Sequence, residues 1–358
     1  MSLEAGLAGR KRPVVAITGL EGRDNPYPGV AVARALRAAR GDDVVLVGLA
    51  YDPTLTGNFR GDLFDRVYLT PYPSDPPTTV LRRLREIHAE FSLDAIIPAL
   101  DSEMALYARY AEELAAIGIR TLLPPEASVK RRYKDRLESF CRSIGVHAPR
   151  TEVVADPASF FASSGMSTPC YLKGPLADAV LVETPDDAPA AFWRLANAWG
   201  WPILAQEPVV GEEYDVCAVV DRTGSPRAMI AIKKIVVSRA GKGVAAAVVD
   251  DPEVFAVARR IIAALDWRGP LEVELVREAS SGRFYLIEIN ARFPAWCGAT
   301  PKLGPNLPAL CLGLLLDEPV PPPERPEVGR VFVRTSKTVV GRIESLGALV
   351  ATGRLVHR

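Results

Sequence analysis

The stretch Pro270–Pro294, PLEVELVREASSGRFYLIEINARFP, contains the pattern that decides the fold and the chemistry of this chain. Apolar and polar residues alternate on both sides of an Ala-Ser-Ser-Gly segment, which predicts two β-strands joined by a turn near Ser281. Such a turn places Glu274 directly opposite Glu288. The sequence therefore predicts an antiparallel β-hairpin in which two carboxylates face each other.

The two faces of this hairpin differ in character, because successive side chains of a strand point to opposite sides. The face expected to join a core is apolar: Val273, Leu275, Ile287 and Ile289. The other face is polar and charged: Glu272, Glu274, Glu288, Asn290 and Arg292. On that face the same register places Glu272 opposite Asn290 as a second pair.

Opposed carboxylates require a cation to offset their repulsion. At about 4 Å and an effective dielectric constant of roughly 20, two like charges cost about 4 kcal/mol, which is more than a mobile surface lysine returns. Carboxylate and amide oxygens suit Mg²⁺, which completes its shell with phosphate oxygens and water. The alternative is an edge hairpin whose glutamates only face solvent. Because Glu288 and Asn290 interrupt the apolar strand FYLIEIN, the pattern favours a metal–nucleotide site.

The composition narrows the function classes. The 358 residues include 43 basic and 43 acidic side chains, which argues against a nucleic-acid binder held by bulk charge. With three histidines and five widely spaced cysteines, a metal would be bound by oxygen, and a reducing compartment is indicated. The sequence has no apolar run of the roughly 20 residues that a membrane helix needs and no signal-peptide core. We therefore expect a cytoplasmic protein that binds neither membrane nor nucleic acid.

Strand-like and helix-like segments alternate in the first part of the chain, which predicts a parallel sheet. Its strands are expected at residues 14–18, 43–49, 66–69 and 94–97. Asp101 and Glu103 follow the last of these strands, where ligands of open α/β sheets bind, although acids facing solvent are equally compatible with the pattern. A long helix is then predicted over 127–144, followed by a small subdomain of mixed helices and strands.

The fold class is thus α/β combined with α+β. We expect a parallel α/β domain over 13–125 and a second domain over 126–318, with a small lid subdomain at about 150–210 and an antiparallel sheet. A proline-rich connector and a small strand pair are expected over 319–358.

These motifs, taken in order, resemble the ATP-grasp superfamily, particularly the branch with biotin carboxylase and the carbamoyl-phosphate synthetase large chain. The hairpin carries its metal signature, with EINAR at its end. The segment YKDRLESFCRSIGVHAPRT is similar to the first nucleotide-lysine motif with Lys134, and YLKGPLADAVLV to the second with Lys173. LAQEPVVGEEYDV resembles the family's hinge. The resemblance covers about residues 13–318.

The resemblance implies a role for each matching residue. Lys134 and Lys173 would contact ATP, the hinge Gln206, Glu207, Pro208 and Val209 would read adenine, and Glu213 or Glu212 would approach the ribose. Glu274, Glu288 and Asn290 would hold one or two Mg²⁺ ions, with Mn²⁺ as a substitute. Arg292 would steady the phosphorylated substrate. Two alternatives stay open. Glu207 is equally compatible with a salt-bridge role. The basic cluster of Lys233, Lys234 and Lys242 is compatible either with anion binding or with plain surface charge.

The implied reaction is attack of a carboxylate on the γ-phosphate of ATP. The acylphosphate would then be captured by an amine or thiol with loss of phosphate, on a small molecule or a peptide. Such chemistry requires cations and positioning rather than a protein nucleophile. A homodimer is compatible with the sequence.

Two departures from the family pattern support an alternative. The loop Gly174–Val180 is short and has one glycine, and Tyr133 stands where an aspartate is usual. A catalytically weak ATP-binding protein with a regulatory or scaffold role is therefore the second hypothesis. An NAD-type dehydrogenase is the third, but Gly19-Leu-Glu-Gly22 lacks the G-x-G-x-x-G order.

Overall fold

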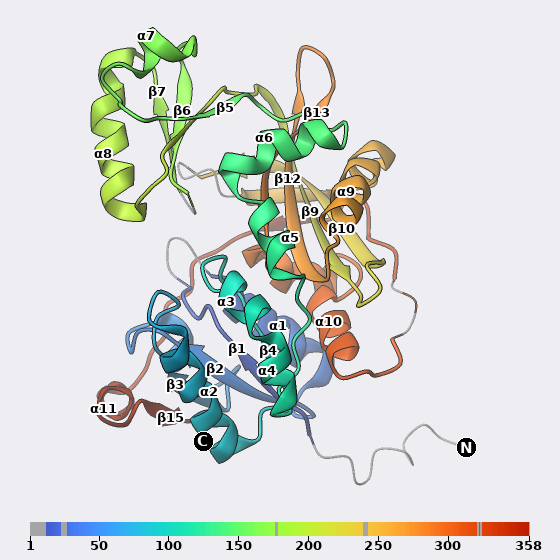
Figure 1. Ribbon diagram of the computed structural model, residues 1–358. Coiled ribbons are helices and arrows are strands. Elements are labelled where there is room, and N and C mark those ends of the chain that lie inside the picture. The colour runs from blue at the N-terminus through green and yellow to red at the C-terminus, as the bar shows by residue number, and fades with distance from the viewer. Residues whose placement is uncertain are drawn as a thin grey trace.

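The computed structural model describes residues 12–22, 27–175, 178–238, 243–320, 322 and 324–357. Within these ranges the strands form three sheets, each in its own part of the molecule (Figure 1). The predicted fold class, α/β combined with α+β, is confirmed: one sheet contains the predicted parallel strands, and the other two sheets are antiparallel.

The parallel sheet is built by the first part of the chain. Its parallel strands are β1 (Val14–Ile17), β2 (Val45–Ala50), β3 (Arg66–Leu69) and β4 (Ala95–Ile97), in the order β3-β2-β1-β4, and a fifth, antiparallel strand from the carboxy-terminal segment lies next to β3. Its helices are α1 (Pro28–Arg40), α2 (Pro77–Phe91), α3 (Met104–Arg109) and α4 (Ala111–Ala116), and η2 (Thr56–Phe59) is a short 3-10 turn. Every residue of β1 and β2 is buried, as expected for parallel strands covered on both faces. The carboxyl ends of β1 and β4 lie side by side, where the crossovers diverge and ligands usually bind.

The prediction of one continuous helix over 127–144 is wrong. The chain forms α5 (Glu126–Arg131) and α6 (Lys134–Ser143), separated at Tyr133, whose backbone is extended with φ −59° and ψ 142°. In one continuous helix, Arg132 and Lys134 would point to nearly opposite sides of the axis, about 160° apart. The break explains how both of these side chains can be buried.

The lid contains a four-stranded antiparallel sheet in the order β5-β8-β6-β7. Its elements are β5 (Thr151–Val153), α7 (Phe160–Ser164), β6 (Cys170–Lys173), β7 (Ala179–Val182), η3 (Pro185–Asp187), α8 (Ala188–Trp199) and β8 (Leu204–Gln206). A small core of its own lies between α8 and the sheet, formed by residues such as Phe192 and Leu172. The lid stands apart from the parallel sheet at the other end of the molecule (Figure 1).

The third sheet has six strands in the order β13-β12-β9-β10-β11-β14. Its elements are β9 (Gly211–Val220), β10 (Pro226–Val237), β11 (Gly243–Val249), α9 (Pro252–Leu265), β12 (Gly269–Glu278), β13 (Phe284–Asn290), η4 (Ala295–Lys302) and α10 (Leu307–Leu315). Helix α9 packs on one face, in the core that contains Val216 and Ile261. The core on the other face contains Cys217, together with α10 residues and parts of the parallel sheet.

The predicted hairpin is confirmed, and so are its two predicted residue pairs. Glu274 pairs with Glu288 and Glu272 with Asn290 in the β12–β13 ladder. A register shift follows Glu274, so that Leu275 pairs with Leu286. The expectation that Ile287 joins the core is therefore wrong, because this irregularity brings the fully buried Leu286 to the core in its place.

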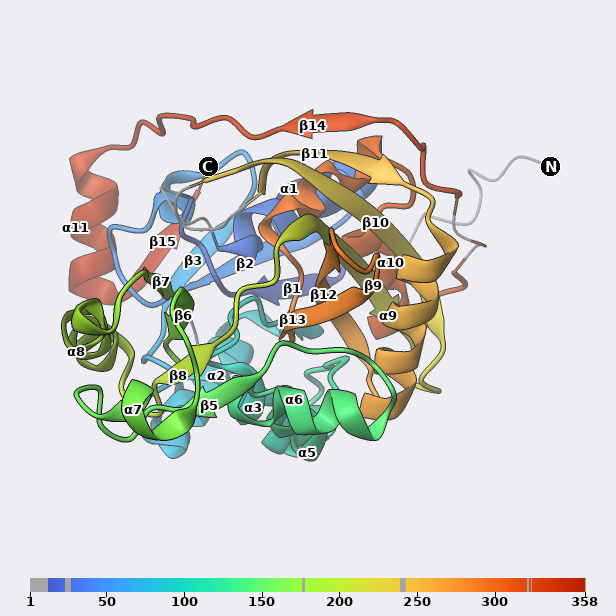
Figure 2. The same ribbon diagram turned by 90° about the horizontal axis from the view of Figure 1, so that it is seen from above.

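The carboxy-terminal segment links two of the sheets. The strand pair expected there is wrong, because β14 (Val331–Val333) pairs with β11 and β15 (Arg354–Val356) pairs with β3. Helix α11 (Ile343–Thr352) lies between them, and Figure 2 shows the segment passing over the molecule from one sheet to the other. The domain limits 13–125, 126–318 and 319–358 stay a prediction. Among the described residues, no helix combines the length and apolar character needed to cross a membrane.

Candidate functional site

A row of carboxylates crosses three adjacent strands of the six-stranded sheet. Asp215 of β9 is paired with Glu274 of β12, and Glu274 is paired with Glu288 of β13. Directly paired residues share a face, so the three carboxylates point to the same side of the sheet. The sequence analysis missed Asp215, although its spacing of two residues from Glu213 was a signal that both lie on one face.

Lys234 of β10 offsets part of this negative charge. Its Nζ lies 3.0 Å from Glu213 Oε2, 3.2 Å from Asp215 Oδ1 and 3.2 Å from Glu274 Oε2. The side chain is only 4% exposed. Burial alone would lower the pKa of Lys234, but Glu274, Asp215 and Glu213 raise it above its ordinary value. Lys234 is therefore a fixed, charged member of the site, which the sequence had left undecided.

The same carboxylates affect the acids beside them. Burial, opposed by Lys234 and reinforced by Glu274, raises the pKa of Asp215 well above its ordinary value. Burial, followed by repulsion from Glu274, also raises the pKa of Glu272. The carboxylates of the acidic face thus repel one another, and an additional cation would reduce this repulsion.

Lys134 lies at the start of α6 and reaches the other end of the row. Its Nζ is 3.3 Å from Glu288 Oε1, and its side chain is 10% exposed. The two opposed glutamates are therefore each neutralised by a lysine, Glu274 by Lys234 and Glu288 by Lys134. The expectation that lysine could not offset the pair holds only for mobile surface lysines, because these two are fixed by burial.

Lys173 approaches the site from the lid, at the end of β6. Burial, reinforced by the nearby positive charge of Lys134, lowers the pKa of Lys173 to about 8, although Glu288, Glu274 and Glu213 act in the opposite direction. A cation that is destabilised in this way gains from an anionic ligand. Residues 176 and 177 of the loop that follows lie outside the described residues, as does Lys242.

Arg292 lies at the end of β13 and is held by several acceptors. Its Nη2 donates to Asn290 Oδ1 at 3.0 Å, and its Nη1 to the Phe293 carbonyl at 3.1 Å. Nη1 also lies 3.4 Å from Glu272 Oε2. Burial would lower the pKa of Arg292, but the surrounding carboxylates, led by Asp101, raise it. The guanidinium is thus permanently charged and fixed in orientation.

Asn290 and Glu272 form the centre of this network. Asn290 Nδ2 donates to Glu272 Oε2 at 2.9 Å and to Glu274 Oε1 at 2.8 Å. Trp296 Nε1 donates to Glu272 Oε1 at 2.9 Å. Sequence reasoning had placed Glu272 on the correct face, but its contact with Trp296 depends on tertiary packing. Glu272 therefore serves to hold Asn290 and Arg292 in place.

The parallel sheet contributes Asp101, which follows β4. Asp101 Oδ2 lies 2.9 Å from Arg292 Nε, and Oδ1 lies 3.0 Å from Arg132 Nη2. Arg132 Nη1 donates to the Ile289 carbonyl at 3.0 Å. Glu103, in contrast, accepts from Thr18, Tyr51 and two backbone amides, so it stabilises the ends of β1, β2 and β4. Of the two acids noted after this strand, only Asp101 reaches the site.

The hinge residues connect β8 to β9. Gln206 is buried and its Nε2 donates to Thr151 Oγ1 at 3.0 Å, while the backbone N–H of Glu207 donates to the Arg150 carbonyl at 3.1 Å. The Glu207 side chain is exposed, and Pro208 and Val209 are partly exposed. The predicted contact of this backbone with adenine stays a prediction.

The two glutamates considered for the ribose lie on opposite faces of β9. Glu213 points to the face with Lys234, whereas Glu212 pairs with Lys233 and accepts from Tyr214. Of the two, only Glu213 contacts the lysine that holds the carboxylate row.

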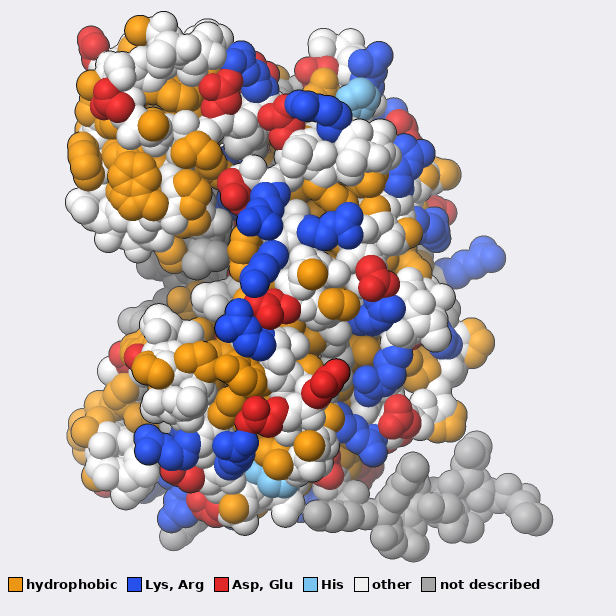
Figure 3. Space-filling model, in the orientation of Figure 1, with side chains coloured by type: hydrophobic (Ala, Val, Ile, Leu, Met, Phe, Trp, Pro, Cys, Tyr) orange, Lys and Arg blue, Asp and Glu red, His pale blue; other side chains and the backbone are white. Residues whose placement is uncertain are grey.

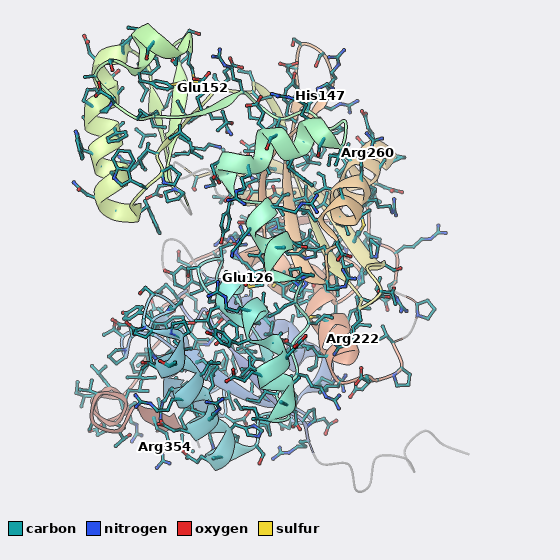
Figure 4. All side chains as sticks on the ribbon, viewed as in Figure 1. Glu126, His147, Glu152, Arg222, Arg260 and Arg354 are labelled. Atoms are coloured by element: carbon teal, nitrogen blue, oxygen red, sulfur yellow. The ribbon has the colours of Figure 1, made fainter. Side chains whose placement is uncertain are left out.

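The site lies where the three sheets meet. Figure 3 shows a hollow between the lid and the parallel sheet, with Lys and Arg side chains along its border. Figure 4 shows Glu126 at the start of α5, beside that junction, where it pairs with Arg109 at 2.6 Å. In the same view His147 lies beside β13, and its ring is 5.4 Å from that of Tyr285.

The donor set fits a hard divalent ion. Glu274 and Glu288 are paired across the ladder and offer only oxygen, as Mg²⁺ requires. Asn290 directs its nitrogen to the glutamates and its oxygen to Arg292. Within the described ranges, no three His, Cys, Asp or Glu side chains converge as a metal site. An ion would therefore be held after the glutamates turn from their lysines, and its role would be to neutralise phosphate charge.

Comparison with known proteins gives one family match. Residues 178–295 match the family model described as ATP-grasp domain. No curated protein sequence matches the chain significantly.

Three solved structures share the fold. An N5-carboxyaminoimidazole ribonucleotide synthetase with ADP has a TM-score of 0.67 at 15% identity, over 90% of this chain and 81% of that chain. The L-amino acid ligase of Bacillus licheniformis has a TM-score of 0.61 at 16% identity, over 86% of this chain and 75% of that chain. The third is the biotin carboxylase domain of the Hydrogenobacter thermophilus 2-oxoglutarate carboxylase, with MgADP and bicarbonate. Its TM-score is 0.63 at 14% identity, over 86% of this chain and 71% of that chain. The expected resemblance to the superfamily is confirmed at this level: residues 178–295 match the ATP-grasp domain model, and the chain shares the fold of these solved structures.

Proposed function

We propose that this protein is an ATP- and Mg²⁺-dependent ligase that joins a carboxylate to an amine or a thiol through an acylphosphate. The observation that carries the proposal is that three cations lie close enough to Glu274 and Glu288 to interact with them: Lys134 pairs with Glu288, and the charges of Lys173 and Arg292 interact with both glutamates. These cations come from three separate segments of the chain. Such an arrangement suits the transfer of a phosphoryl group, whose charge spreads over several oxygens.

Each residue of the site would have a separate role in the reaction. Lys173 and Lys134 would bind phosphate oxygens of ATP, and Glu213 would approach the ribose. Bound Mg²⁺ would neutralise the charge on the phosphates. Arg292 would hold the anionic acyl group, since its charge and orientation are fixed by its neighbours.

The proposed reaction requires no nucleophile from the protein. The substrate carboxylate itself attacks the γ-phosphate and displaces ADP, and the acylphosphate carbon is then attacked by the acceptor, with phosphate leaving. The protein must position three reactants and exclude water. The described cysteines are buried, and burial raises the pKa of Cys217 well above its ordinary value, so a thiolate role is not part of the proposal.

The partners are therefore a small-molecule or peptide carboxylate and an amine or thiol acceptor, and the nucleotide is ATP with one or two Mg²⁺ ions. The structures of similar fold include complexes with ADP and with MgADP. One of these proteins is an L-amino acid ligase, which supports an amine as acceptor here.

The test is a phosphate-release screen over pools of carboxylic acids and amines, with ATP and Mg²⁺. The proposal expects release that requires an acid, an acceptor and Mg²⁺ together, with ADP as the other product. ADP release with no dependence on acid or acceptor would contradict the ligase assignment.

A second function is supported by one observation. Both glutamates of the predicted metal pair are already neutralised by Lys234 and Lys134. A catalytically weak protein that binds ATP to regulate a partner would use the same lysines without efficient turnover. Saturable ATP binding by calorimetry, with no phosphate release from any pool, would select this function.

A further inference from the structure

Asp101 belongs to the parallel sheet by sequence, but its carboxylate contacts the opposite half of the site. Its Oδ2 lies 2.9 Å from Arg292 Nε. Its Oδ1 lies 3.0 Å from Arg132 Nη2 and accepts the backbone N–H of Ala291 at 3.0 Å. One side chain thus joins the end of β4, the break between α5 and α6, and the end of β13.

These contacts restrict the Arg292 guanidinium in a way that its other partners do not. Glu272 and Phe293 hold Nη1, and Asn290 holds Nη2, so all three of these contacts come from the hairpin and its extension. Asp101 alone among these four contacts Nε, and it does so from a different sheet. Because a free arginine side chain has many rotamers, each added contact narrows the directions in which the guanidinium can point.

Asp101 is suited to this task by its surroundings. Its side chain is 17% exposed, and that of Arg132 is 7% exposed. Burial would raise the pKa of Asp101, but Arg292 and Arg132 lower it below its ordinary value, so the carboxylate stays ionised. Arg132 is itself held by the Ile289 carbonyl, so Asp101 is fixed from both sides.

We propose that Asp101 is a positioning residue for the ligase reaction, which orients the Arg292 guanidinium toward the acyl group from the end of β4. The inference rests on the proposed function, since it takes the contact between Arg292 and substrate from there. It adds that the parallel sheet takes part in the chemical step through this residue. A misplacement of about 1 Å in such a group costs on the order of 100-fold in rate.

The test compares Asp101→Asn with a matched control, Asp221→Asn. Asp221 has similar burial at 12% exposure, accepts two backbone N–H groups at 2.9 and 3.0 Å, and pairs with Arg227 at 3.6 Å. Asp221 directly follows β9, six residues beyond Asp215 of the carboxylate row. Phosphate release gives kcat and KM, and calorimetry gives the ATP dissociation constant of each variant.

Asp101→Asn is expected to lower kcat about 30- to 100-fold and to leave the ATP dissociation constant within twofold, whereas Asp221→Asn leaves both unchanged. A merely structural role would reduce the active fraction and weaken ATP binding as well. A kcat within twofold of the wild type would overturn the inference.

A second readout does not depend on turnover. In protein labelled with ¹⁵N-arginine, the Nε–H resonance of Arg292, assigned with Arg292→Lys, is expected to be protected from solvent exchange. Asp101→Asn should remove this protection and Asp221→Asn should keep it. If no acid supports phosphate release, the proposed function fails while this resonance still decides the inference. Retained protection in Asp101→Asn would contradict it.

Asp101→Glu covers the case in which Asp101→Asn does not fold. It keeps the charge but displaces it by one methylene, so a positioning role predicts a kcat at least tenfold lower and a shifted Nε–H resonance. Wild-type values of both quantities in Asp101→Glu would overturn the inference.

Discussion

Lys173 should reduce the stability of the ligand-free protein, and its replacement by methionine should restore that stability. Its pKa is about 8 in the folded protein, against roughly 10.4 in an unfolded chain. The folded state therefore disfavours the ammonium by about 3 kcal/mol, since each pKa unit corresponds to about 1.4 kcal/mol. Methionine keeps the length of the side chain and removes the charge.

The sign follows from proton linkage. Below about pH 8 Lys173 is charged in both states, and the folded state bears the full cost, so Lys173→Met should be more stable by up to about 3 kcal/mol at pH 7. As the pH rises from 8 to 10.5, the unfolded chain still binds the proton and the folded protein does not, so wild-type stability increases. At pH 10 the difference should fall below about 1 kcal/mol.

Urea unfolding followed by circular dichroism and tryptophan fluorescence measures this difference at both pH values. Trp193, Trp199 and Trp201 report on the lid. Lys130→Met serves as the control, because Lys130 is 44% exposed and pairs only at the surface with Glu126; it should change stability by less than about 0.5 kcal/mol. A Lys173→Met variant less stable than the wild type at pH 7, or a gain that persists at pH 10, would refute the reasoning.

Three further predictions concern the same residues and the hairpin. In the ligand-free protein Lys173 loses its proton above about pH 8. The ATP dissociation constant, measured by calorimetry, should therefore rise by up to about tenfold per pH unit above that value. Arginine stays charged, so a similar rise in Lys173→Arg would contradict the role of Lys173. Glu288→Gln should abolish Mg²⁺-dependent phosphate release, whereas Glu278→Gln, near the hairpin turn, should not; full release by Glu288→Gln would remove it as a metal ligand. Leu286→Ala should lower the free energy of unfolding by about 2 to 5 kcal/mol, because Leu286 is fully buried, and Ile287→Ala by much less; equal losses in urea unfolding would contradict the observed register shift.

The fold could be predicted wherever local pattern and packing agree. The four parallel strands and the hairpin register follow from alternation and turn chemistry, which act over a few residues. The register shift after Glu274 could not be predicted, because period two assumes an uninterrupted ladder. The break at Tyr133 was missed for a similar reason: 127–144 has helical composition throughout, and only the burial of Arg132 and Lys134 requires the chain to turn.

The site was predictable along each segment but not between segments. Glu274 and Glu288 could be paired from sequence because one turn joins them. Lys234 and Asp215 join the same cluster through neighbouring strands, and Arg132 and Asp101 through contacts between sheets. These pairings depend on tertiary packing, which spacing in one sequence does not encode. The carboxy-terminal strands show the same limit, since each pairs with a different distant sheet.

The central claim is that Glu274 and Glu288 leave their lysines to hold a divalent ion that carries the phosphates of ATP. A crystal structure of the protein grown with Mg²⁺ and a non-hydrolysable ATP analogue tests this most directly. The account predicts a Mg²⁺ ion about 2.1 Å from oxygens of both glutamates and of the phosphates, with Lys173 within hydrogen-bond distance of the nucleotide. Glutamates still paired with Lys234 and Lys134, and no ion between them and the analogue, would contradict it.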